Sequence, residues 1–326
     1  MDFGRRALFN SLRINWLVDP SSKVLPWQVE DYRLLPLDEI FLRLHHKDVN
    51  LDRISFGALA EEADSPEDLC DALLADADLE PAEQDQIYLL IFELWRRLAN
   101  EKPCLSIFCD ELDYQIFAYD HQSMPRPEDI QDAVANLEVI LDENTDEGAD
   151  PVEVFEMISN GCANDLETFL YDYISEQIDN HNYAYTSDLL DSFGTYVKDT
   201  SWFSFLRARL LSHTHPESAD EMIRYLTRDI KKQQDLDLSL EVLSFLAKGG
   251  DPDLFRTLAK QTVPMLETEE DFQELLVICA DYYHFLDQER EESMVQKILK
   301  ERPQNAWENP IQPKDGKVRE FLKILA

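Results

Sequence analysis

Residues 84–120, QDQIYLLIFELWRRLANEKPCLSIFCDELDYQIFAYD, decide the fold class of this chain. Apolar residues recur there at steps of three and four, the spacing of one buried helix face. A first stripe precedes a break at residues 100–103 and a second follows it: Ile87, Leu90, Ile91, Leu94, Trp95 and Leu98, then Leu105, Phe108, Cys109, Leu112, Ile116 and Tyr119. The two stripes predict an antiparallel helix hairpin whose second helix opens on Pro103.

The rest of the chain repeats this helical spacing, so the sequence predicts an all-α fold built from antiparallel helix hairpins. Residues 1–18 suggest an amphipathic helix that docks on the body, with Leu8, Leu12 and Trp16 on one side and three arginines elsewhere. Residues 20–36 contain three prolines and read as an irregular arm. Further helices are predicted over residues 37–46, 51–60 and 130–141, and one begins at the serine cap of 65–68.

Polar residues 142–150 form the best candidate boundary between domains. We therefore expect a helical domain over residues 1–125, a helix and acidic linker over 126–150, and a second helical domain over 151–326. Residues 302–326 suggest an extended segment along the body, followed from Lys314 by a short basic helix that caps the last apolar face.

Four helix pairs are predicted to open at Asn164, Thr200, Asp235 and Thr268, which are 36, 35 and 33 residues apart. A helix-pair period near 35 is typical of stacked helical repeats. In period and amphipathicity, residues 150–300 resemble the tetratricopeptide and HEAT-like families, and DPDLFR at 251–256 is similar to a HEAT segment. The resemblance implies a superhelical surface that binds a protein or peptide; a non-repeating helical domain is the alternative.

Composition excludes several classes of protein. No run of about eighteen apolar residues predicts a membrane-spanning helix, and residues 1–18 lack a signal-peptide pattern. The five scattered cysteines indicate reduced thiols in a cytoplasmic protein. The net charge of −37 argues against nucleic acid and anionic membrane as direct partners, because both are themselves negative.

The charge is concentrated in residues 127–197, where 18 of 71 residues are Asp or Glu and none is Lys or Arg. Such a segment suggests a surface that attracts a basic protein partner; a merely solvated acidic surface is the alternative. The candidate partner-binding residues are Asp165, Glu167, Asp172 and Glu176.

Motifs for catalysis or cofactor binding are missing: the sequence has no glycine-rich phosphate loop, HExxH motif or paired CxxC, and we expect no cofactor. One metal pattern occurs, since five oxygen-bearing residues occupy positions 1, 3, 5, 9 and 12 of an EF-hand-like calcium loop. They are Asp142, Asn144, Asp146, Asp150 and Glu153, but Glu147 stands where that loop needs glycine. An acidic interdomain loop is the alternative.

The sequence therefore favours a non-enzymatic, acidic, α-helical interaction module or scaffold that binds a basic protein. Two other classes stay open. One is a helical-bundle enzyme with an unrecognised carboxylate or histidine site. The other is a nucleic-acid mimic whose carboxylates imitate phosphates.

Overall fold

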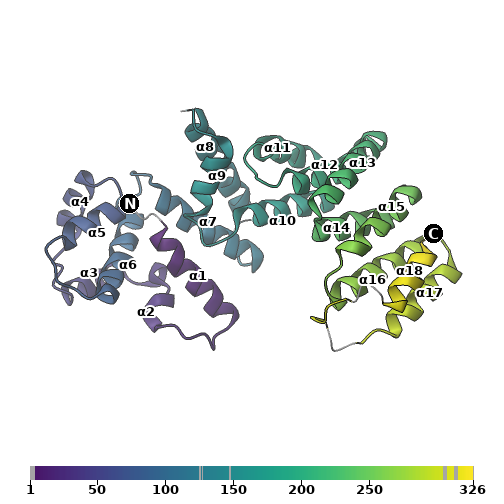
Figure 1. Ribbon diagram of the computed structural model, residues 1–326. Helices are drawn as coiled ribbons and strands as arrows, with labels where there is room; N and C mark the ends of the chain where they lie inside the picture. Colours follow the sequence, from purple (N-terminus) through teal and green to yellow (C-terminus); the bar gives the residue numbers. More distant parts are fainter. Residues whose placement is uncertain are drawn as a thin grey trace. The chain divides into compact units, whose positions relative to one another are not determined.

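The computed structural model describes residues 4–124, 126, 128–146, 148–303, 307–311 and 315–325 (Figure 1). Over these residues the chain forms eighteen α-helices and two short 3₁₀ helices, η1 and η2, and no strand. The all-α class predicted from the apolar spacing is confirmed.

The first nine helices and η1 cover the chain as far as Ser159. Their bounds are α1 (Arg5–Val18), α2 (Pro26–Val29), η1 (Tyr32–Leu34), α3 (Leu37–His45), α4 (Arg53–Glu62), α5 (Pro66–Leu74), α6 (Pro81–Leu98), α7 (Leu105–Asp120), α8 (Glu128–Asp146) and α9 (Pro151–Ser159). The predicted irregular arm contains α2 and η1, and α7 begins two residues after Pro103.

The remaining helices follow from Leu166. Their bounds are α10 (Leu166–Asp179), α11 (Tyr183–Phe193), α12 (Thr200–Thr214), α13 (Pro216–Gln233), α14 (Leu236–Ala247), α15 (Pro252–Thr262), η2 (Val263–Met265), α16 (Glu269–Phe285), α17 (Glu289–Lys300) and α18 (Gly316–Ile324).

Side-chain caps explain where several helices begin. The side chains of three residues at predicted helix starts, Ser65, Asp235 and Thr268, act as caps. Each accepts a hydrogen bond from the backbone N–H of the residue three positions later. The cap of α10 differs from the prediction, because Asp165 rather than Asn164 accepts from the backbone of the first turn. The Asn164 amide is used elsewhere, as described below.

The chain divides into two compact units. Unit 1 comprises Met1–Leu170 with Thr195–Val197, and unit 2 comprises Tyr171–Gly194 with Lys198–Ala326. The division lies within α10, and residues 142–146 of the predicted boundary belong to α8.

In unit 1, α6 forms the centre of a core that buries nine consecutive residues from Ile87 to Trp95. This helix packs mainly on α5 and α3, whereas α7 packs mainly on α1 and α8. Helices α6 and α7 are therefore not the tightly packed pair that residues 84–120 predict. Helix α1 contacts both, since its arginines reach Asp85 near the start of α6 and Asp110 on α7.

In unit 2, consecutive helices pack as pairs: α12 with α13, α14 with α15, and α16 with α17. Each pair contacts the next through α14. The segment 307–311 runs along the start of α16, where Glu269 N–H donates to Asn309 O at 2.8 Å. Helix α18 then buries Phe321 in the same core, as expected of a terminal cap; its predicted start, Lys314, lies outside the described residues.

Candidate functional site

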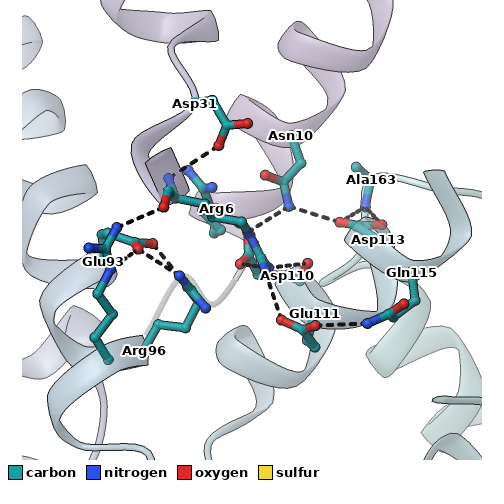
Figure 2. Close-up of polar contacts among 12 residues, drawn as sticks. Arg6, Asn10, Asp31, Glu93, Arg96, Asp110, Glu111, Asp113, Gln115 and Ala163 are labelled. Atoms are coloured by element: carbon teal, nitrogen blue, oxygen red, sulfur yellow. Dashed lines mark hydrogen bonds and ion pairs between the residues drawn. The ribbon is translucent and has the colours of Figure 1, made fainter. Parts of the chain in front are cut away.

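One face of α7 is held by a buried polar network that anchors α1 and η1 (Figure 2). The Asp110 carboxylate is 3% exposed and accepts hydrogen bonds from Arg6 Nε at 2.6 Å and Arg33 Nη2 at 2.7 Å. Asn10 Nδ2 donates to the same carboxylate at 3.1 Å. Burial alone would raise the pKa of Asp110, but the two guanidinium groups lower it to about 2.

One turn later, Asp113 ties α7 to the turn that precedes α10. Its carboxylate accepts from the backbone N–H of Ala163 at 2.9 Å and of Asn164 at 3.1 Å. The Asn164 side-chain amide donates to it at 2.8 Å. Asn10 Nδ2 donates to it at 3.1 Å (Figure 2). Burial raises the pKa of this carboxyl despite these donors.

The cavity beside this network measures about 30 Å³ and is lined by Arg6, Asn10, Asp110 and Asp113 among others. That is the space of about one water molecule. The network therefore has no room for a substrate, and it holds α7 in place.

The arginines of α1 form ion pairs that the sequence does not predict. Arg5 and Arg6 point into the body, where Arg5 Nη2 donates to Asp85 at 2.7 Å, while Leu8 is exposed. Arg13 likewise donates to Asp31 at 2.7 Å. Helix α1 docks as expected, through these paired charges together with Phe9 and the partly buried Leu12.

A wide groove lies on a different face of α7, between that helix, α8 and α9, all within unit 1. Its volume is about 620 Å³. At 100° per residue, Leu105, Phe108 and Leu112 share one side of α7, and Asp110 and Asp113 point to another. The lining residues are Asn100, Pro103, Cys104, Leu105, Ile107, Phe108, Glu111, Leu112, Ala133, Asn136, Val139, Ile140, Glu143, Asn144 and Met157.

The groove exposes apolar side chains that no described residue of unit 1 covers. Val139 is 51% exposed and Met157 is 39% exposed, while Phe108 and Ile140 are half-buried. The pocket volume falls in the range that binding sites for small molecules and apolar anchors occupy. These side chains are therefore available to contact a bound segment.

The charged residues that line the groove, Glu111 and Glu143, are both acidic, and so are the helices around it. Helices α7, α8 and α9 contain four, seven and two acidic residues, thirteen in all, and no Lys or Arg. Arg126, between α7 and α8, pairs with Asp129. Glu143 is exposed on the groove, whereas Glu111 is already paired with Arg33 at 2.8 Å.

The four predicted partner-binding residues lie elsewhere, on or beside α10. Asp165, Asp172 and Glu176 are exposed, and Glu167 is half-buried. Asp172 and Glu176 are one turn apart and share a face of α10, and partial burial raises the pKa of Asp172. None of the four lines the groove.

The calcium-loop pattern does not form a loop. Asp142, Asn144 and Asp146 belong to the last turns of α8, so the extended turn that an EF-hand loop needs is replaced by helix. Asp142 accepts from Tyr196 Oη at 2.5 Å, and Asn144 Nδ2 donates to Ile140 O at 2.7 Å.

The other half of the pattern begins α9. Asp150 caps that helix by accepting from Val152 N–H and Glu153 N–H, and Glu153 lies in its first turn. Glu147 lies outside the described residues. Elsewhere in the described chain, no three His, Cys, Asp or Glu side chains gather closely enough to hold a metal ion.

Comparisons of the chain with protein-family models, curated proteins and solved structures give no match. The resemblance to tetratricopeptide and HEAT-like repeats therefore rests on helix period and amphipathicity alone. None of the described helices is long and apolar enough to cross a membrane.

Sequence reasoning misses the groove, although α8 carries a signal of it. The apolar spacing of α8 predicts one buried stripe, but the structure buries Val134 and Leu137 and leaves Ala133 and Ile140 at the groove. With Val139, the apolar face of α8 is wider than one neighbouring helix covers. That excess width indicates a second apolar contact surface.

Proposed function

We propose that this chain is a protein-interaction module that captures a basic, amphipathic segment of a partner protein in the groove between α7, α8 and α9. The observation that carries the proposal is an uncovered apolar groove of about 620 Å³ whose three helices have thirteen acids and no Lys or Arg. Apolar side chains of the partner supply binding energy there, and its cations supply charge complementarity.

The chain itself contains an example of this recognition. Helix α1 sets Arg6 against the Asp110 carboxylate of α7 and buries Phe9 in the core around α6, which combines the two interactions expected of the partner. In the groove, the apolar side chains of Val139 and Met157 provide the contact surface and Glu143 provides an exposed charge. The exposed acids of α10 add to the net charge of −37, which favours the approach of a basic protein.

Two fluorescent peptides of about 18 residues test the proposal, each with the same leucine positions but with lysine in one and glutamate in the other. Fluorescence anisotropy measures their affinity for the full chain at about 0.02 M and about 0.2 M salt. We expect the lysine peptide to bind, more weakly at high salt, and the glutamate peptide not to bind.

A matched pair of variants locates the binding. Val139→Ser with Met157→Ser removes apolar surface from the groove and should weaken lysine-peptide binding roughly tenfold. Val277→Ser with Met294→Ser makes the same changes in unit 2, where these residues are 46% and 39% exposed, and should leave binding unchanged. Equal affinities of the two double variants would refute the groove as the binding site, and so would a lysine peptide that does not bind.

A further inference from the structure

We infer that the segment held in the groove is an α-helix of about three turns, with one apolar stripe and a basic residue toward the end that meets Glu143. The inference rests on the proposed function and specifies the conformation and residue pattern of the partner. It follows from the length, surface exposure, wall chemistry and charge placement of the groove.

The length of the groove is set by α8. Its lining residues run from Ala133 to Asn144, eleven steps of about 1.5 Å, or about 16 Å. A helix of about eleven residues, three turns, spans that distance, whereas an extended chain spans it with about five residues.

The groove lies open at the surface, because Val139 and Met157 on its walls are 51% and 39% exposed. A helix lying in it keeps one side against these walls and the other side in water, so the bound helix must be amphipathic.

The walls disfavour an extended segment. The long walls are helices α7, α8 and α9, whose backbone groups are hydrogen-bonded within the helix, and the loop residues Asn100, Pro103 and Cys104 complete one end. The described residues of this chain contain no strand edge, so an extended segment could not pair its backbone N–H and C=O groups by strand addition and would leave them to water or side chains. A helix pairs its own backbone groups and presents only side chains to the apolar walls.

The exposed carboxylate of the groove, Glu143, lies toward one end. Helices α7 and α8 are joined by a short link and pack together, so they run antiparallel. Glu143 then lies toward the Cys104 end of α7, whereas Glu111, nearer the Ala133 end of α8, already accepts from Arg33. A cation at one end of the partner helix, next to apolar residues at i, i+3, i+4 and i+7, matches this arrangement.

Three lysine–leucine peptides of identical length test the inference on the full chain. The first has leucines at helical spacing, the second has the same composition with leucines at alternate positions, and the third is the first with a central proline. Anisotropy gives the affinities, and far-ultraviolet circular dichroism of the mixtures gives the helix content on binding. We expect the first peptide to gain helix and to bind at least about tenfold more tightly than the other two.

The Val139→Ser/Met157→Ser variant should abolish that preference, and the Val277→Ser/Met294→Ser control should preserve it. If the alternating peptide binds as tightly as the helical one and still depends on Val139 and Met157, the helical conformation is refuted while the proposed function stands. If no peptide binds, or none depends on the groove, both are refuted. Equal binding of the proline peptide also overturns the helix.

Discussion

At the scale of single residues, Asp110 shows how the fold of unit 1 depends on charge. Its carboxylate is buried between Arg6 and Arg33, which come from α1 and η1. Each of the three groups would be costly to bury alone, so the positions of α1, η1 and α7 depend on one another.

Replacing Asp110 with alanine leaves Arg6 and Arg33 without their shared partner. We expect unit 1 to lose about 3–5 kcal/mol of stability, measured by hydrogen exchange of the α1 amides. Glu39→Ala is the control, because the Glu39–Arg43 pair is partly exposed and its loss should cost less than about 1 kcal/mol. Equal losses in the two variants would contradict a central role for Asp110.

The same contact predicts a dependence on pH. The pKa of Asp110 falls from 3.8 to about 2 on folding, so its contribution is present above pH 4 and is lost as the pH falls toward 2. The shift corresponds to about 2 kcal/mol. The acid unfolding of Asp110→Ala should lack this component, and an unchanged acid transition would argue against it.

Glu143 is the residue at which the charge of the groove can be tested alone. Glu143→Lys should weaken binding of the lysine peptide about tenfold at low salt, because it places a like charge beside the bound cation. Glu221→Lys, at an exposed position in unit 2, changes the net charge equally and should have a much smaller effect. Anisotropy compares the two; equal weakening would mean that net charge alone drives binding.

At the scale of helices and turns, replacing a glycine by alanine should change stability in opposite directions at two positions, Gly57 within α4 and Gly250 in the turn between α14 and α15. Gly57 lies inside α4, and a Cβ added there would have no neighbouring atom within 4 Å, so Gly57→Ala should stabilise unit 1 by about 0.5–1 kcal/mol. At Gly250, a Cβ would lie 2.9 Å from Leu246 Cα, so Gly250→Ala should destabilise unit 2 by about 1–3 kcal/mol. Thermal unfolding gives both signs, and the same sign for both variants would refute the argument.

Helices and many of their caps can be predicted from sequence, because both are local. The Ser65 and Thr268 caps need only their own turn and an apolar stripe after it. The prediction fails at residues 142–146 because their polarity suggests a loop, whereas α8 continues through them and uses Asn144 to bond its own backbone. The Asp110 network cannot be predicted from sequence, and the wide apolar face of α8 indicates a second contact surface without locating the groove, since both depend on which helices meet around α7.

At the scale of the whole molecule, acidic residues outnumber basic ones by 67 to 30, so at least 37 carboxylates have no cation on a one-to-one count. Neutral salt at about 0.15 M screens repulsion between exposed charges more than about 8 Å apart, and buried pairs such as Arg6–Asp110 are screened less. We expect the thermal midpoint of the full chain to rise by a few degrees between low salt and about 0.15 M salt. That shift corresponds to a gain of about 1 kcal/mol in the free energy of unfolding. Sodium and potassium chloride should act alike, and a fall in the midpoint would contradict this.

The docking of α1 also sets an order of events during synthesis on the ribosome. Arg6 is synthesised about a hundred residues before its partner Asp110. Asn10 likewise precedes its partner Asp113, and the backbone donors to Asp113 at residues 163 and 164 are synthesised later still. At about 5–20 residues per second, the basic residues of α1 are synthesised on the order of 5–20 s before the carboxylates of α7 that pair with them. During that interval α1 is a cationic, partly apolar segment close to anionic ribosomal RNA, and it can dock only after α7 is complete.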